Sequence, residues 1–287
     1  MTVIDSHVHV WDLDRATYDW LDEATPLLNR SIDLVEAEWE LAAAHVDGVV
    51  LVQSADNPED TANMFRVADA HRQVVGVVGW VPLDDARRTA DLLDQYQVDE
   101  RFVGVRSLIH NRLDPDWIVG VEADTGLSIL EARGIPFDFV TSSPATLRHV
   151  PVIADRHPDL RIVLDHLGKP PIGGSTADIA RWRGALLEIG AIEQVFAKVS
   201  GLYPPVGSEK QLVEVVKTAV EAFGASRMMF GGDWPISLLF GGYESTWGNL
   251  SMALDPLTVA ERRQILGETA VRCYGLRVER LDAAPPR

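Results

Sequence analysis

The chain has 287 residues, a formal net charge of −17 and 46% hydrophobic residues. This length suits one large α/β domain, since barrels of about 250 residues commonly form a single domain. The acidic charge argues against a nucleic-acid partner, because phosphates would be repelled. No apolar run approaches the roughly 20 residues needed to span a bilayer, so no membrane partner is expected.

Cys273 is the only cysteine, so no intramolecular disulfide can form. The N-terminal segment contains Asp5 and lacks the basic start of a secretory signal. We therefore expect a cytoplasmic protein, and we leave open whether it forms a homodimer.

Short apolar runs alternate with helical patterns along the chain. Strands are predicted at residues 3–10, 48–53, 74–81, 102–109, 136–141, 161–166, 195–200 and 228–231. Helices are predicted at residues 34–46, 60–71, 86–96, 117–133, 145–156, 177–189, 209–223 and 258–274. The nearly continuous apolar run at 48–52 is typical of a parallel strand covered on both faces. Asn57-Pro58 and Gly134 fit the start and the end of helices.

Eight strand–helix alternations in one chain predict an α/β fold of the (β/α)8 or TIM-barrel class. We expect a single domain over residues 1–280 and a short C-terminal tail at 281–287. A doubly wound open sheet is the alternative, but no glycine-rich dinucleotide turn follows the first strand. Residues 236–250 are predicted to form a lid or an insertion loop.

In such a barrel, catalytic residues lie at the C-terminal ends of the strands. His7 and His9 are two residues apart on the first strand, so their side chains point to the same side. Imidazole is a common metal ligand and a proton carrier near neutral pH. The other strand ends carry further polar or aromatic candidates, namely Gln53, Trp80, Arg106, Asp138, Asp165, His166, Lys169, Lys198, Ser200 and Asp233.

At these positions the chain resembles the amidohydrolase superfamily, and within it amidohydrolase-related family 2. The resemblance rests on the first-strand histidine pair, on His166 in the run Asp-His-Leu-Gly-Lys-Pro and on Asp233 in the run Phe-Gly-Gly-Asp-Trp-Pro. The stretches at 78–83 and 104–106 are similar to the branch that opens lactones of sugar acids and dicarboxylates. The resemblance extends over about residues 3–275.

The resemblance implies a role for each matched position. Asp233 would be the general base that deprotonates the hydrolytic water, with His166 and Arg106 completing the catalytic set. His7, His9 and Asp233 would bind one divalent, zinc-like ion, which can polarise a carbonyl and acidify a bound water. The predicted substrate-binding residues are Gln53, Trp80, Asp138 and Lys198.

The chain also departs from the metal-rich members of the superfamily. Arg106 stands where binuclear members have a bridging lysine, and Asp138 where they have a histidine, so a binuclear site is not expected. A metal-free site is the alternative to a single ion, with the histidines donating hydrogen bonds to the developing oxyanion. Arg106 has two interpretations: it binds a substrate carboxylate, or it pairs with Asp138 or Asp165.

The resemblance implies an enzyme, a carboxylic ester hydrolase that opens a small lactone. A sugar-acid lactone, such as L-fucono- or L-rhamnonolactone, is the favoured substrate. The alternatives are a pyrone or muconolactone carboxylate, or a metal-dependent decarboxylation of an aromatic acid on the same barrel. A non-catalytic binding protein is disfavoured, because it would not need the polar residues at the strand ends.

Overall fold

The computed structural model describes residues 1–282 and contains eight parallel strands in one sheet, in chain order. The strands are β1 (Ile4–Val8), β2 (Gly48–Val52), β3 (Val74–Gly79), β4 (Phe102–Ser107), β5 (Phe137–Phe139), β6 (Ile162–Leu164), β7 (Val195–Val199) and β8 (Met228–Phe230). Each lies within a predicted strand and is shorter than it. The predicted (β/α)8 barrel is confirmed.

The barrel closes between β1 and β8. A parallel bridge joins Val8 to Trp234. The amide of His9 donates to the Trp234 carbonyl at 2.7 Å, and the amide of Asp233 donates to the His7 carbonyl at 2.8 Å. The backbone bonds that close the barrel therefore also fix the histidine pair against Asp233.

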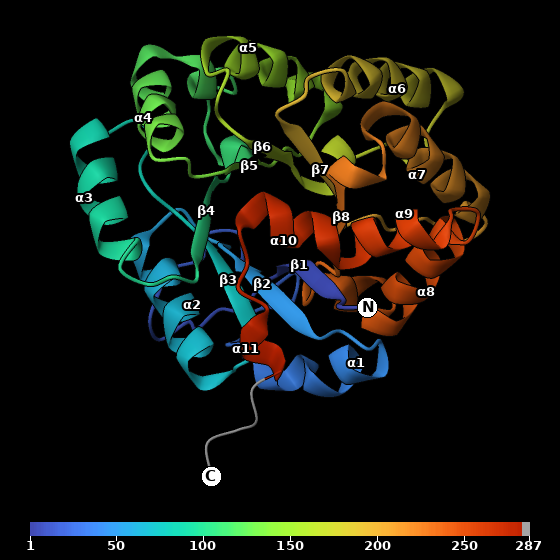
Figure 1. The fold of residues 1–287 in the computed structure, drawn as a ribbon, viewed down its shortest axis with the longest axis horizontal. Helices are drawn as coiled ribbons and strands as arrows, with labels where there is room; N and C mark the ends of the chain where they lie inside the picture. The colour runs from blue at the N-terminus through green and yellow to red at the C-terminus, as the bar shows by residue number, and fades with distance from the viewer. Residues whose placement is uncertain (283–287) are drawn as a thin grey trace.

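Helices surround the barrel (Figure 1). They are α1 (Glu38–Ala43), α2 (Pro58–Ala70), α3 (Ala86–Tyr96), α4 (Val121–Ala132), α5 (His149–Arg156), α6 (Thr176–Gly190), α7 (Glu209–Phe223), α8 (Gly242–Leu254), α9 (Val259–Arg263), α10 (Thr269–Tyr274) and α11 (Glu279–Asp282). The helix start predicted at Asn57-Pro58 is confirmed at α2. The Asn57 side chain caps this helix by accepting a hydrogen bond from the Asp60 amide at 2.9 Å. Among the described residues, no helix is long and apolar enough to cross a membrane.

Two apolar clusters hold the fold together. The larger one lies between the strands and the surrounding helices. The smaller one combines strand residues such as Ile4, Val163 and Met229 with Cys273 and Tyr274 of α10. Figure 1 shows α10 and α11 lying across the barrel in front of the strands. These helices cover the amino-terminal end of the barrel, which leaves the opposite end for a site.

Several segments differ from the sequence prediction, and the predicted helices 34–46, 117–133 and 145–156 each begin with a 3-10 turn. Residues 236–250 form a short 3-10 turn, η7 (Ile236–Phe240), and most of α8 rather than a loop. A π-helical turn at Gln264–Glu268 interrupts the predicted helix 258–274, and a Cβ on Gly267 would lie 2.2 Å from the Thr2 carbonyl oxygen. Helix α11 runs across the predicted boundary at residue 280, and Leu281 packs on the smaller cluster. The rest of the predicted tail, residues 283–287, lies outside the described residues.

Candidate active site

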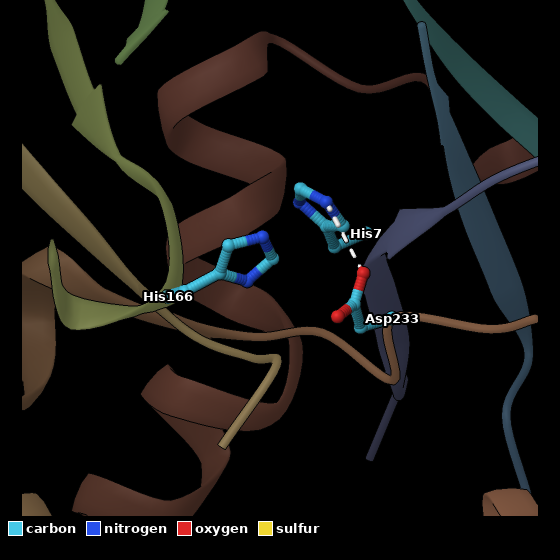
Figure 2. A group of neighbouring side chains, drawn as sticks. All are labelled: His7, His166 and Asp233. Carbon is cyan, nitrogen blue, oxygen red and sulfur yellow. Dashed lines mark ion pairs between the residues drawn. The ribbon is translucent and has the colours of Figure 1, made fainter. Parts of the chain in front are cut away.

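Three side chains converge at the carboxyl ends of β1 and β8. Nε2 of His7 lies 3.2 Å from Nε2 of His9. Oδ1 of Asp233 lies 3.7 Å from the His7 nitrogen and 3.5 Å from the His9 nitrogen. His166 approaches the same point from the loop after β6, as Figure 2 shows. Ligating atoms of His7, His166 and Asp233 all lie within 4.8 Å of one another.

Each imidazole is held by a partner on its other ring nitrogen. Nδ1 of His9 lies 2.7 Å from the Val52 carbonyl oxygen, and Nδ1 of His166 lies 2.9 Å from the Ser200 hydroxyl. Nδ1 of His7 lies 3.3 Å from Oδ1 of Asp165. Such partners fix the ring orientation and the tautomer of metal-ligating histidines. The arrangement leaves the Nε2 atoms of His7 and His9 directed at the shared centre.

The convergence fits a single divalent ion. Two atoms bound to zinc at tetrahedral positions, each about 2.0–2.1 Å from the ion, lie about 3.4 Å apart. The separations of 3.2, 3.5 and 3.7 Å among His7, His9 and Asp233 are close to this value. The donor set of two imidazoles and one carboxylate is typical of zinc. His7, His9 and Asp233 would hold the ion, with His166 beside them.

Burial controls the charge of these groups. Burial lowers the pKa of His166 to about 3, assisted by the nearby Lys169 ammonium. Burial likewise lowers the pKa of His7 well below its usual value. Burial raises the pKa of Asp233, but the neighbouring imidazoles of His166, His9 and His7 outweigh this, so its pKa lies below the usual range. Neutral imidazoles beside an ionised carboxylate are the protonation states that metal binding requires.

Asp5 joins the two strands that carry the centre. Its Oδ1 accepts hydrogen bonds from the amides of His7 at 3.0 Å and Gly232 at 2.8 Å, and its Oδ2 accepts one from the Tyr243 hydroxyl at 2.7 Å. Complete burial raises the pKa of Asp5 to about 6. A Cβ on Gly232 would lie 2.3 Å from the Tyr243 ring, so only glycine allows this close approach.

The loop after β7 packs against Asp233 and His166. The Tyr203 hydroxyl donates to Oδ2 of Asp233 at 2.8 Å, and the Tyr203 ring stacks on Phe240 with centroids 4.1 Å apart. Gly201 has φ +57°, and a Cβ there would lie 2.5 Å from Nδ1 of His166 and 2.8 Å from Oδ2 of Asp233. The loop therefore needs glycine at this position to bring its neighbours against both side chains.

Beneath the centre lies a buried ionic network, the ionic floor, formed by Arg106, Asp138, Asp165 and Lys198. Nζ of Lys198 contacts Oδ2 of Asp138 at 2.6 Å, Oδ1 of Asp165 at 3.2 Å and Nδ1 of His7 at 3.2 Å. Nη1 of Arg106 lies 3.0 Å from Oδ2 of Asp165 and 3.3 Å from Nε2 of His7.

The two carboxyl groups of the ionic floor differ in proton affinity. Burial raises the pKa of Asp138 to about 6, despite its contact with Lys198. Burial also raises the pKa of Asp165, but the opposing effect of Lys198 and His7 is larger. The pKa of Asp165 therefore lies well below its usual value. The Tyr274 hydroxyl of α10 donates to Asp138 at 2.8 Å, which links the floor to the helix that covers the other end of the barrel.

The centre opens into a cavity of about 310 Å³, the mouth cavity. Its wall consists of His9, Trp20, Ser54, Arg106, Leu108, His110, Asn111, Val140, Thr141, Ser142, His166, Lys169, Asp233 and Ile236. Most residues on this wall follow strand ends, in agreement with a barrel active site.

His166 begins a left-handed turn. The φ angles of His166, Leu167, Gly168 and Lys169 are +55°, +50°, +68° and +56°. A left-handed conformation costs roughly 1–2 kcal/mol per non-glycine residue, so the surrounding structure must hold this turn in place. The Lys169 amide donates to the His166 carbonyl at 2.9 Å, and the Trp182 indole donates to the Leu167 carbonyl at 2.8 Å.

The structure brings some of the predicted site residues together and separates others. His7, His9, His166, Asp233 and Arg106 meet as expected, and Arg106 pairs with Asp165, one of its two interpretations. The predicted substrate-binding residues are Gln53, Trp80, Asp138 and Lys198. None of them is among the described residues that form the wall of the mouth cavity.

The reason is that these residues are buried, are paired within the protein or face another cavity. Asp138 and Lys198 are completely buried and satisfy each other in the ionic floor. The Gln53 amide donates to Asp56 and to the Arg106 carbonyl, each at 3.0 Å. Trp80 borders a neighbouring cavity of about 400 Å³.

Sequence reasoning missed Tyr203 and Tyr243, which fix Asp233 and Asp5. It also missed Trp20, which lies on the walls of both the mouth cavity and the neighbouring cavity. Tyr203 could have been found from its position, because it lies three residues after Ser200, which was itself a candidate at the end of a predicted strand.

Comparison with known proteins agrees with this geometry. A family model described as Amidohydrolase matches residues 4–276. An L-fucono-1,5-lactonase of Burkholderia ambifaria is 32% identical over 287 residues, covering 96% of this chain and 96% of that protein. An L-fucono-1,5-lactonase of Burkholderia multivorans is 31% identical over 288 residues, covering 95% and 96%.

A solved structure, an amidohydrolase from Burkholderia multivorans with bound zinc, has a TM-score of 0.90 and 27% identity, covering 96% of this chain and 100% of that chain. The fold similarity and the family match extend over almost the whole barrel. The chain belongs to the amidohydrolase family of enzymes.

Proposed function

We propose that this enzyme is a lactonase that opens the ring of a sugar-acid lactone, with L-fucono-1,5-lactone as the first candidate. The convergence of His7, His9 and Asp233 at the floor of the mouth cavity carries the proposal. The names of the two curated relatives, both L-fucono-1,5-lactonases, support the choice of substrate class.

The reaction adds water to the ring ester carbonyl and breaks the bond between the carbonyl carbon and the ring oxygen. A bound zinc ion would supply carbonyl polarisation and an acidified water. Asp233 is ionised, and it accepts the proton of the attacking water, while the Tyr203 hydroxyl holds its carboxylate in place. It then returns this proton to the ring oxygen, which leaves as a hydroxyl group. The product is a hydroxy acid, whose ionisation releases one proton.

The mouth cavity supports a substrate of one sugar ring. A volume of about 310 Å³ is at the small end of ligand pockets. Asn111 and Ser142 offer amide and hydroxyl groups to sugar hydroxyls, and Trp20 offers an aromatic face. The hydroxyls of Ser54 and Thr141 donate to Asp60 and to the Ser143 carbonyl, so they can serve only as acceptors.

The test is a panel of lactones mixed with zinc-loaded protein in weak buffer with a pH indicator, because ring opening releases a proton. We expect rapid acidification with L-fucono-1,5-lactone or a related aldonolactone, and loss of at least about a thousandfold in rate for Asp233→Asn. Acidification with pyrone or muconolactone carboxylates alone would overturn the substrate class. No acidification with any lactone, together with release of carbon dioxide from aromatic acids, would overturn the reaction.

A further inference from the structure

The left-handed turn that starts at His166 brings a second side chain to the mouth cavity. The turn is closed by an i to i+3 hydrogen bond from the Lys169 amide to the His166 carbonyl. In a turn of three residues, side chains three positions apart project to the same side. His166 and Lys169 accordingly both lie on the cavity wall.

This turn is strained and fixed by packing at the same time. Only Gly168 of its residues is a glycine, and a Cβ there would lie 2.5 Å from the Leu147 side chain. Leu167 is completely buried. Left-handed backbone at several successive non-glycine residues is found mostly at functional sites. The side chains that this turn places on the cavity wall are therefore candidates for a function. These are the imidazole of His166, which belongs to the centre, and the ammonium group of Lys169, which has no role in the mechanism described so far.

The other two cations near the centre are already paired with buried carboxylates. Lys198 is completely buried, pairs with Asp138 at 2.6 Å and with Asp165 at 3.2 Å, and is not among the described residues on the wall of the mouth cavity. Arg106 uses both terminal nitrogens on Asp165, His7 and the Gln53 carbonyl.

Lys169 differs from both. It is half-buried on the cavity wall, and no carboxylate among the described residues lies within ion-pair distance of its Nζ. All three of its N–H groups are therefore available to a bound molecule. The wall also carries His9, His110, His166 and Arg106, with Asp233 as its one carboxylate in the described part of the chain. In a chain of net charge −17, this cavity is locally rich in basic groups.

We propose that Lys169 is the substrate-binding residue that recognises the negative charge created by ring opening, and that it sets a preference of the cavity for carboxylate over neutral polyol ligands. The inference rests on the proposed function. A neutral lactone gains negative charge first on its carbonyl oxygen and then on the product carboxylate, and an ammonium group with free donors binds both. Lys169 therefore binds the transition state and the product more strongly than the substrate.

The experiment uses two open-chain probes that differ in charge. L-fuconate carries the carboxylate, and L-fucitol is its neutral polyol counterpart. Titration calorimetry on the zinc-loaded protein measures both dissociation constants in the wild type, Lys169→Met, Lys169→Arg and the control Lys210→Met. Lys210 lies exposed on α7, so its replacement removes the same charge far from the cavity wall.

We expect the wild type to bind L-fuconate at least tenfold more tightly than L-fucitol. Lys169→Met should remove most of this preference and lower kcat/KM for L-fucono-1,5-lactone at least tenfold, while Lys169→Arg keeps part of both. Lys210→Met should match the wild type. Methionine is no more strained than lysine at this φ, and circular dichroism verifies that the variants are folded.

Unchanged preference in Lys169→Met, or no preference in the wild type, would overturn the inference. A wild type that prefers L-fuconate through Lys169 but opens no lactone would refute the proposed function and leave the role of Lys169 standing.

Discussion

The Tyr203 hydroxyl donates a hydrogen bond of 2.8 Å to Oδ2 of Asp233. The two oxygens of this carboxylate therefore have different partners, because Oδ1 faces His7 and His9. Tyr203 is itself held by stacking on Phe240. A tyrosine from the β7 loop thus orients the carboxylate that follows β8.

Replacing Tyr203 by phenylalanine tests this orientation. Hydrogen bonds to charged groups contribute about 1.5–3 kcal/mol, so we expect kcat for lactone opening to fall about tenfold to a hundredfold while KM changes little. Steady-state kinetics with the pH-indicator assay measures both. Tyr96→Phe is the matched control, because the Tyr96 hydroxyl is buried on α3 without a partner among the described residues. An equal loss in both variants would contradict a specific role.

Gly201→Ala tests the close approach of the β7 loop. The new methyl group would lie 2.5 Å from Nδ1 of His166, in a backbone with φ +57°. Gly207→Ala is the control, since Gly207 has φ +87° and a Cβ there would meet nothing within 4 Å. Both variants carry the backbone cost of a left-handed alanine, of about 1–2 kcal/mol. We expect only Gly201→Ala to lose most of the activity and to bind zinc more weakly, measured by kinetics and by metal titration.

Metal removal tests the stoichiometry of the centre. Arg106 and Lys198 place two cations against His7, so little room for a second positive ion is left beside the first. We expect chelation to abolish lactone opening, and one equivalent of zinc per chain to restore it. Atomic absorption on the reconstituted enzyme measures the content. Two tightly bound ions per chain, or full activity after exhaustive chelation, would contradict the prediction.

Lys198→Met tests the ionic floor. The substitution leaves Asp138 and Asp165 buried without their shared cation, and breaking a buried ion pair in this way destabilises a protein by about 3–5 kcal/mol. Urea unfolding of the metal-free protein measures the loss. The double variant Lys198→Met, Asp138→Asn removes the charge of Asp138, whereas Asp165 still pairs with Arg106 in both variants. We expect it to be more stable than Lys198→Met alone, and an equal or lower stability would show that the charges are not coupled.

The sequence predicts most of the fold and part of the site. The apolar runs locate every strand, because a parallel strand covered on both faces must be apolar. The spacing of His7 and His9 correctly places both imidazoles on one side, since side chains alternate along a strand. Both features depend on the spacing of residues along one strand, and this spacing can be read from a single sequence.

What the sequence leaves open depends on long-range geometry. Lys198 and Arg106 are both cations of the ionic floor near strand ends, yet Lys198 is completely buried whereas Arg106 also reaches the cavity wall. This difference depends on which side chains from other strands surround each cation, and no residue type encodes that. Tyr203 is likewise indistinguishable from an ordinary loop tyrosine until the loop is seen against Asp233.

The link from Tyr274 through Asp138 and Lys198 to His7 has a consequence for the order of events during synthesis. The first strand carries His7 and His9, two of the three converging side chains. Asp138 receives the Tyr274 hydroxyl only after α10 has left the ribosome and docked under the barrel. A nascent chain that ends before α10 contains every ligand but lacks the support beneath them. The support beneath the converging side chains is therefore complete only when α10 has docked, which makes their arrangement a property of the finished barrel.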